Sequence, residues 1–286
     1  MTGAHRIVVS AENNAYTGWQ CKLFYFSCVT RLNHQPIIVV HESGNESHPD
    51  FYDLVKAGCR VHSAPNYRIT GHGDSYYPRN TAGSLIHAGE ICSRDDLVVL
   101  CDSDMIFARA PQFPSTLSGD FVSYMNYDRE VVVKAKNDLG IVRELGKEEE
   151  ETLRCGVPYV IPAAIAKELG HAWLQAVDAF PPRRWEDIMY AFGLAVVKLG
   201  LEVQLTHLAA HNFSPTELLT APMIHYCYGD ERWSKRDYFH EDQARAVWNP
   251  TLGAPDGTIL GELIRQIRDA AVFYRDVYFP DGIGHA

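Results

Sequence analysis

The sequence predicts an α/β fold in which helices flank a mixed, mostly parallel central sheet. Short β-branched runs alternate with longer helical patterns over the first hundred residues, one of these runs is apolar throughout, and no linker rich in proline, glycine or serine divides the chain. Alternation of this kind is typical of βαβ units, and an apolar run indicates a strand covered on both faces. We therefore expect one compact domain.

The first half of the chain is expected to contain four strands and three helices. Apolar residues recur at helical spacing from Trp19 to Val29, with Thr17 as the predicted N-cap. The second helix is expected to end at Gly58, the residue type that most often follows a helix. The expected strands span residues 6–10, 36–40, 60–63 and 96–100, and the expected helices span 17–32, 51–57 and 81–92.

The second half has a less regular pattern. Strands are expected at residues 121–124, 159–161 and 201–206, and helices from Pro162 to about 180, over 185–199 and over 259–278. Gly200 is expected to cap the second of these helices. Residues 128–154 are highly charged and favour a solvated helix or a connecting segment over a partner-binding one.

Composition excludes several classes of function. The 286 residues include 26 lysines and arginines against 36 aspartates and glutamates, a formal net charge of −10. Such a chain has no general attraction for nucleic acids or anionic membranes. The sequence shows neither a membrane span nor a signal peptide, so a cytoplasmic protein is expected. The seven cysteines, without a C-x-x-C pair, predict reduced and mostly buried thiols.

Two carboxylates follow the most apolar predicted strand. The sequence Asp102-Ser103-Asp104 comes directly after the run Leu-Val-Val-Leu-Cys at 97–101. Open α/β sheets bind ligands at the carboxyl ends of their strands, and residues i and i+2 of an extended chain project to the same side. The pair could therefore bind one hard cation together with phosphate groups. A turn cap is the alternative, since this composition produces about one such pattern by chance.

His225 and Lys235 are the further candidates for this site. An imidazole beside two carboxylates gives the mixed coordination that suits Mn²⁺ or, with more water, Mg²⁺. Cations between Arg232 and Arg236 could neutralise a departing diphosphate. A histidine satisfied within the core and a plain surface patch are the respective alternatives. His211, four residues after His207, is a weaker substitute for His225.

The strand that ends in Asp102-Ser103-Asp104 resembles the metal-binding D-x-D of nucleotide-sugar glycosyltransferases with the GT-A fold. Three other segments resemble the hydroxyproline O-arabinosyltransferases and peptidyl-serine galactosyltransferases more narrowly. They are Trp19-Gln20, residues 185–192 (Trp-Glu-Asp-Ile-Met-Tyr-Ala-Phe), and residues 224–229 (Ile-His-Tyr-Cys-Tyr-Gly) with Lys235. The resemblance implies a GT-A domain over residues 1–286, with a nucleotide-binding half of about 1–107 and an acceptor half of about 108–286.

The resemblance also implies roles for individual residues. Asp102, Asp104 and His225 would bind Mn²⁺ or Mg²⁺, and Lys235 would contact the diphosphate of a UDP-sugar donor. The remaining donor-binding candidates come from four places: the end of the first strand with the residues after it, the first helix, the residues just before the third helix, and the D-x-D itself. They are Ser10, Ala11 and Glu12, then Gln20, then Arg79 and Asn80, and finally Asp102 and Ser103.

Glu186 and Asp187 are the catalytic candidates. Two acids in the first turn of a helix often only complement its dipole. Alternatively, one carboxylate faces the acceptor, as a general base in an inverting transfer or as an orienting group in a retaining one. The families resembled are retaining, which favours retention here.

The sequence thus predicts transfer of a sugar from a UDP-sugar to a hydroxyl group of a peptide or a small molecule. A nucleotidyltransferase that makes nucleotide sugars is one alternative. It should have a glycine-rich phosphate loop after the first strand, whereas residues 10–15 contain no glycine. A nucleotide-sugar-binding protein without enzymatic activity is the other alternative.

Overall fold

The computed structural model describes residues 3–42, 44, 46–180 and 184–278. The chain divides into two compact units that draw on alternating stretches of sequence. Unit 1 comprises Met1–Ser10, Ser63–Asp102 and Phe113–His207, and unit 2 comprises Ala11–His62, Ser103–Gln112 and Leu208–Ala286. A single domain with two contiguous halves stays a prediction.

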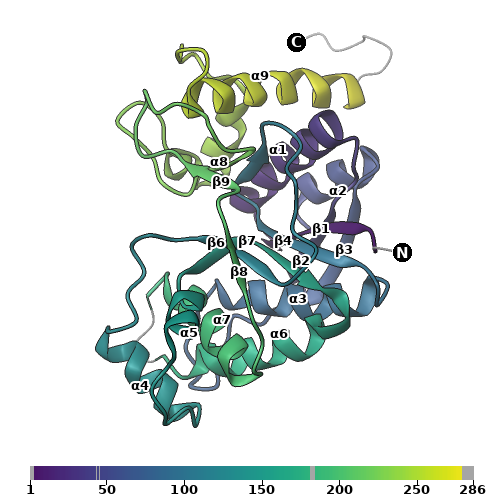
Figure 1. Cartoon of the computed structure of the whole chain (residues 1–286). Helices are drawn as coiled ribbons and strands as arrows, with labels where there is room; N and C mark the ends of the chain where they lie inside the picture. Colours follow the sequence, from purple (N-terminus) through teal and green to yellow (C-terminus); the bar gives the residue numbers. More distant parts are fainter. Residues whose placement is uncertain (1–2, 43, 45, 181–183, 279–286) are drawn as a thin grey trace. The chain divides into compact units, whose positions relative to one another are not determined.

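The strands form one sheet of seven and one sheet of three (Figure 1). The order of the larger sheet is β3-β2-β1-β4-β7-β6-β8, and that of the smaller sheet is β5-β10-β9. The strands of the larger sheet are β1 (His5–Glu12), β2 (Ile37–Glu42), β3 (Arg60–Pro65), β4 (Leu97–Asp102), β6 (Ser118–Phe121), β7 (Cys155–Pro162) and β8 (Gln204–Thr206). The predicted α/β fold with a mixed central sheet is confirmed.

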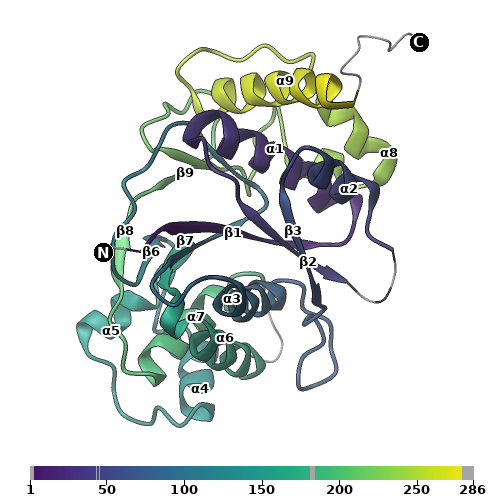
Figure 2. The same ribbon diagram turned by 90° about the vertical axis from the view of Figure 1, so that its right-hand side faces the viewer.

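Unit 1 is built on a sheet with both parallel and antiparallel pairs. β1 runs parallel to β4, so that Ser10 lies opposite Asp102 at their carboxyl ends. β7 runs antiparallel to both β4 and β6, and β8 returns parallel to β6. Helices α3 (Arg79–Ile91), α6 (Ala163–Asp178) and α7 (Asp187–Lys198) gather on one side of these strands (Figure 2). The unit therefore has a core between its sheet and a helical layer.

Unit 2 is organised around helix α1 (Ala15–Leu32), with α2 (Pro49–Lys56) and α9 (Ile259–Tyr278) packed against it (Figures 1 and 2). The small sheet of this unit contains β5 (Met105–Phe107), β9 (Ala209–His211) and β10 (Met223–His225). The Tyr274 hydroxyl of α9 donates to the Lys22 carbonyl of α1 at 2.9 Å, and the Gln266 amide donates to the Phe107 carbonyl at 2.9 Å. These bonds fix α9 over α1 and β5.

The predicted N-cap of the first helix is wrong. α1 begins at Ala15, and the Asn14 side chain accepts from the Thr17 backbone N–H at 3.0 Å. The Thr17 hydroxyl instead donates to the Glu12 carbonyl. Asparagine is a strong N-cap because its carbonyl oxygen reaches the free N–H groups of the first turn, so the helix starts one residue after it.

The strand predicted at residues 121–124 is displaced. β6 ends at Phe121, and Val122 packs beyond it in a turn. The strand carries buried polar residues, and the Asp120 carboxylate accepts from the Thr206 hydroxyl of β8 at 3.0 Å. Polar residues at buried positions hide a strand from a search for apolar runs.

The charged segment 128–154 contains α4 (Glu130–Asp138) and α5 (Lys147–Thr152). Val132 and Ala135 of α4 are fully buried, so apolar side chains hold this charged helix in place. The helix predicted at 185–199 corresponds to α7, and it is buried from Met189 to Val197 because it packs against α5, α6 and β7. Gly200 follows it with a φ of +64°, as its predicted capping role requires.

The sequence predicts reduced, mostly buried thiols and shows no membrane span. All seven cysteines lie in the described part of the chain, none of them forms a disulfide bond there, and all except Cys92 and Cys227 are buried. Among the helices that the structure describes, none combines the length and the apolar character needed to cross a bilayer.

Candidate metal and donor site

A buried carboxylate in unit 2 is the centre of the candidate site. Asp104 lies in the turn before β5 and is 5% exposed. One of its oxygens, Oδ1, lies 3.3 Å from Nε2 of His225, at the end of β10. The other, Oδ2, accepts from the Lys235 ammonium, in the 3₁₀ helix η1 (Lys235–Tyr238). Two cationic side chains from far along the chain thus meet at one carboxylate.

Backbone pairing explains how these residues meet. β5 and β10 are antiparallel, with Met105 opposite His225. The Tyr226 N–H donates to the Asp104 carbonyl at 3.0 Å, which extends the pairing by one residue. The Ser103 hydroxyl donates to Gln20 Oε1 of α1 at 3.0 Å. The turn is therefore held from β10 on one side and from α1 on the other.

Asp104 and each of its two partners, Lys235 and His225, shift one another's pKa values. Burial alone would raise the pKa of Asp104, but the Lys235 ammonium and then His225 outweigh it and hold this pKa well below its usual value. Burial would lower the pKa of Lys235, whereas the Asp104 carboxylate raises it above its usual value. The pKa of His225 is also raised, because Cys227 and Asp104 outweigh its burial. Asp104 is therefore ionised and surrounded by cationic groups.

Asp102 is the last residue of β4, and only Ser103 separates it from Asp104 in the chain. Asp102, Asp104 and His225 each offer one possible ligand atom, and these atoms lie within 4.8 Å of one another. Two carboxylate oxygens and one imidazole nitrogen are a donor set that fits Mn²⁺, and Mg²⁺ with additional water. The residues present therefore fit the metal that the sequence predicts.

A second group of possible ligands comprises His211, His225 and Cys227, whose ligand atoms also lie within 4.8 Å of one another. Burial, followed by the nearby His225, lowers the pKa of His211 to about 4, so its imidazole is neutral near pH 7. From the sequence, His211 is predicted only as a substitute for His225, and Cys227 only as one of seven reduced thiols. The overlooked signal is that Cys227 follows His225 by two residues, which favours projection to the same side.

Tyr16 is a further residue beside Lys235 that was not predicted from the sequence. It lies on α1, one turn before Gln20, with the Lys235 Nζ 6.0 Å from the centroid of its ring. Burial raises the pKa of the Tyr16 hydroxyl, against the opposing effect of Lys235, so this phenol is neutral at physiological pH. The i, i+4 spacing of Tyr16 and Gln20 could have indicated that both side chains face the same site.

The other predicted donor-binding residues lie in two places. Ser10 ends the part of β1 that pairs with β4, and Ala11 and Glu12 complete β1. Arg79 and Asn80 begin α3 in unit 1. The Arg79 guanidinium binds both carboxylate oxygens of Asp178, at 3.1 and 3.0 Å, and Asn80 Oδ1 accepts from the Tyr67 N–H at 2.6 Å. Both side chains therefore have structural partners.

Glu186 and Asp187 lie at the start of α7 in unit 1 and share one partner, Arg129. Its guanidinium lies 3.5 Å from Glu186 Oε1 and forms an ion pair with Asp187 Oδ1. Asp187 is 1% exposed, and its other oxygen accepts from the Arg184 N–H at 2.7 Å. Asp187 is thus held by Arg129 and by the backbone that precedes α7, and Glu186 is the more accessible of the two acids.

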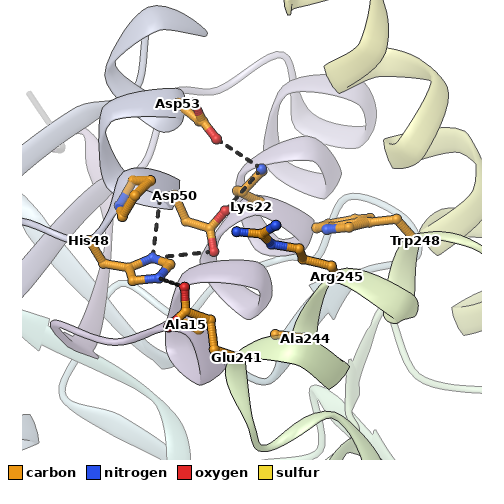
Figure 3. A pocket seen from close by; sticks show the side chains of 10 residues that line it. Ala15, Lys22, His48, Asp50, Asp53, Glu241, Ala244, Arg245 and Trp248 are labelled. Carbon is orange, nitrogen blue, oxygen red and sulfur yellow. Dashed lines mark hydrogen bonds and ion pairs between the residues drawn. The ribbon is translucent and has the colours of Figure 1, made fainter. Parts of the chain in front are cut away.

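A pocket of about 250 Å³ lies elsewhere in unit 2, beside α1, α2, α8 (Glu241–Ala244) and the 3₁₀ helix η2 (Arg245–Trp248) (Figure 3). The Lys22 ammonium inside it pairs with Asp50 at 3.1 Å and Asp53 at 3.2 Å. The His48 ring lies 3.5 Å from Asp50. Because its buried ammonium is already neutralised and Asp104 does not line it, this pocket is a poor candidate for the diphosphate site.

No model of a protein family matches the sequence, and no curated protein does. Among solved structures, the chain is similar to the bifunctional glycosyltransferase WbbM in its apo form, with a TM-score of 0.51 and 14% identity over 97% of this chain and 52% of that one. It is also similar to the galactosyltransferase LgtC in complex with donor and acceptor sugar analogues, with a TM-score of 0.55 and 13% identity over 94% of this chain and 95% of that one. A structure of an LgtC active-site mutant gives a TM-score of 0.54 at 13% identity.

These similarities are similarities of fold. They confirm the predicted α/β fold of the GT-A type. The chain spans about half the length of the WbbM chain that it matches. The narrower resemblance to hydroxyproline O-arabinosyltransferases and peptidyl-serine galactosyltransferases has no support from these structures.

Proposed function

We propose that this chain is a metal-dependent glycosyltransferase that moves a sugar from a UDP-sugar to a hydroxyl group of a peptide or small-molecule acceptor. The observation that carries the proposal is the buried Asp104 carboxylate, which is paired with His225 and Lys235 and lies two residues after Asp102. Similarity of fold to LgtC, a galactosyltransferase with a structure bound to donor and acceptor sugar analogues, supports sugar transfer as the reaction.

Asp102, Asp104 and His225 would hold Mn²⁺ or Mg²⁺. Such a cation stabilises the negative charge that develops on a diphosphate leaving group. Lys235 already pairs with Asp104. When the carboxylate takes up a divalent cation, the Lys235 ammonium becomes available for the diphosphate oxygens. Lys235 and a divalent cation held by Asp102, Asp104 and His225 would together supply the positive charge that an acidic protein must provide for an anionic donor.

Ser10, Ala11 and Glu12 would bind the nucleobase, because they form the carboxyl end of β1, where Ser10 lies opposite Asp102 of the paired strand β4. Gln20 and Ser103, which are hydrogen-bonded to each other, would contact the donor from α1 and from the D-x-D turn. Arg79 and Asn80 would face the donor sugar or its phosphates. For Arg79, this role requires that the guanidinium bind the donor while it keeps its ion pair with Asp178.

We assign to Glu186 the role of contacting the acceptor. Asp187 has a structural role, because it shares the Arg129 guanidinium with Glu186. Trp185 and Tyr124 are 56% and 46% exposed in unit 1, and their ring centroids lie 5.9 Å apart. Exposed aromatic rings offer apolar faces on which an acceptor can stack. In a retaining transfer, which we favour, the Glu186 carboxylate would orient the acceptor hydroxyl.

Release of UDP from a panel of UDP-hexoses and UDP-pentoses, with and without Mn²⁺, tests this function. We expect Mn²⁺-dependent release from at least one donor, and Asp104→Asn should lower it by about 100-fold or more because the site loses a charged ligand. Asp242→Asn, at an exposed acid of α8, is the matched control and should leave turnover unchanged. Turnover of the folded Asp104→Asn variant close to the wild-type value would contradict the assignment, and a protein that only binds nucleotide sugars would release no UDP.

A further inference from the structure

We propose that His211, His225 and Cys227 form a second metal site in unit 2, one that binds Zn²⁺. Two imidazoles and one thiol offer ligand atoms that all lie within 4.8 Å of one another. Two of the three residues play no part in the proposed sugar transfer, and the site is defined entirely by side chains of unit 2.

Strand pairing brings the three ligands together. β9 and β10 run parallel, with His211 opposite His225, and the centroids of the two rings lie 5.3 Å apart. Cys227 follows His225 by two residues. Ligand atoms of a tetrahedral zinc site lie about 3.5 Å apart, so small rotations of these side chains would bring them to coordinating positions.

The donor atoms favour zinc over the cation proposed for the neighbouring group. A thiolate and two imidazoles are softer ligands than the carboxylates of Asp102 and Asp104, and they select Zn²⁺ over Mn²⁺ and Mg²⁺. Three protein ligands leave the fourth position of tetrahedral zinc to water or another small ligand. Binding converts the Cys227 thiol to a thiolate and releases its proton to solvent.

Aromatic residues surround the ligands. The ring centroid of Tyr228 lies 5.8 Å from that of His211 and 4.5 Å from that of Phe213. Phe213 in turn lies 5.6 Å from His211. These contacts restrict the orientation of the His211 ring, and restricting a ligand before the metal arrives lowers the entropic cost of binding.

His225 belongs to both groups of possible ligands. Zinc at the second site therefore competes with Mn²⁺ for this imidazole, and Zn²⁺ should inhibit sugar transfer. That inhibition rests on the proposed function, whereas zinc binding itself does not depend on it.

Cobalt titration of the full-length, metal-free protein tests the site, because Co²⁺ replaces Zn²⁺ and reports thiolate ligation through a near-ultraviolet charge-transfer band. We expect the band to appear with one equivalent of Co²⁺ and to disappear when Zn²⁺ is added. Cys227→Ser should abolish it. Cys92→Ser, at the other partly exposed cysteine, is the matched control and should retain it. His211→Asn should weaken Co²⁺ binding by about 100-fold or more, since even residues outside the ligand shell contribute 10- to 100-fold.

The inference is overturned if the wild-type protein shows no thiolate band, or if the band survives in Cys227→Ser or is lost in Cys92→Ser. Circular dichroism of each variant identifies loss of folding, and His211→Asn gives a second readout at a different ligand. Asp104→Asn separates the two proposals, because it should lose Mn²⁺-dependent transfer and keep the cobalt band. Transfer that persists in that variant contradicts the proposed function alone.

Discussion

Lys235 would compete with the metal that we propose at Asp104, because it already forms an ion pair with this carboxylate. The side chains of both residues are largely buried, at 15% and 8% exposure, so their charges attract each other strongly. A buried ion pair is costly to break when one partner is left without compensation. A divalent cation that binds Asp104 must therefore displace an existing cation, which favours binding together with a diphosphate that can receive Lys235.

Lys235→Met should consequently separate metal binding from nucleotide binding. We expect Mn²⁺ to bind more tightly in the absence of nucleotide, because the competing ammonium is gone. UDP should bind about tenfold more weakly in saturating Mn²⁺, because one charge-assisted contact worth about 1.5 kcal/mol or more is lost. Electron paramagnetic resonance of free Mn²⁺ during titration measures the first effect, and competition by UDP measures the second.

Lys56→Met is the matched control for that experiment, since it removes an exposed lysine charge in the last turn of α2, away from Asp104 in the sequence. It should change neither affinity by more than about twofold, as expected for an exposed charge. Unchanged UDP affinity in Lys235→Met would remove Lys235 from the donor site.

The sequence predicts Asp102, Asp104, His225 and Lys235 as one site. The structure places His225 and Lys235 against Asp104, and the role of these residues stays a prediction. Asp102 and Asp104 could be recognised because they are adjacent to an apolar strand. Arg129, the partner of Glu186 and Asp187, could not be recognised, because more than fifty residues of chain separate it from them. Contacts of this kind depend on the tertiary fold alone.

The close contact between helices α3 and α6 requires a small residue and so affects the stability of the fold. Within unit 1, α3 and α6 pack closely, and Gly170 of α6 faces Ile86 of α3. A Cβ atom added at Gly170 would lie 2.6 Å from Ile86 Cγ1 and 3.1 Å from the Ala82 carbonyl oxygen. The glycine is therefore required by the contact between the two helices.

Gly170→Ala should lower the free energy of unfolding by about 1–3 kcal/mol because it overpacks this contact, even though alanine favours a helix by about 1 kcal/mol. Gly253→Ala is the control, since a Cβ atom there meets nothing within 4 Å. It should change stability by less than about 0.5 kcal/mol. Urea denaturation measures both, and equal midpoints for the two variants would contradict the packing argument.

Periodicity predicted the helices well, because a buried apolar face is a local property of the sequence. α9 was predicted with the bounds that the structure shows. The displaced strand β6 shows the limit of that approach, because its buried Asp120 is satisfied by Thr206 from a strand more than eighty residues away. No pattern within residues 118–124 contains that partner.

At the scale of the whole molecule, the α/β class followed from composition and alternation, but the topology did not. The pairing of β7 between β4 and β6, and of β8 beyond β6, joins segments that are far apart in the chain. The two compact units are likewise assembled from alternating stretches. A net charge of −10 makes a local source of positive charge necessary for any anionic donor.

Calorimetric titration of the wild-type protein with UDP, in the presence and absence of Mn²⁺, tests whether a metal links this protein to a nucleotide-sugar donor. We expect binding that requires Mn²⁺, because a cation held by Asp102, Asp104 and His225 would link an acidic protein to an anionic ligand. We also expect that Asp104→Asn loses this Mn²⁺-dependent binding while Asp242→Asn keeps it. UDP binding of equal strength with and without Mn²⁺, or unchanged in Asp104→Asn, would contradict the proposal.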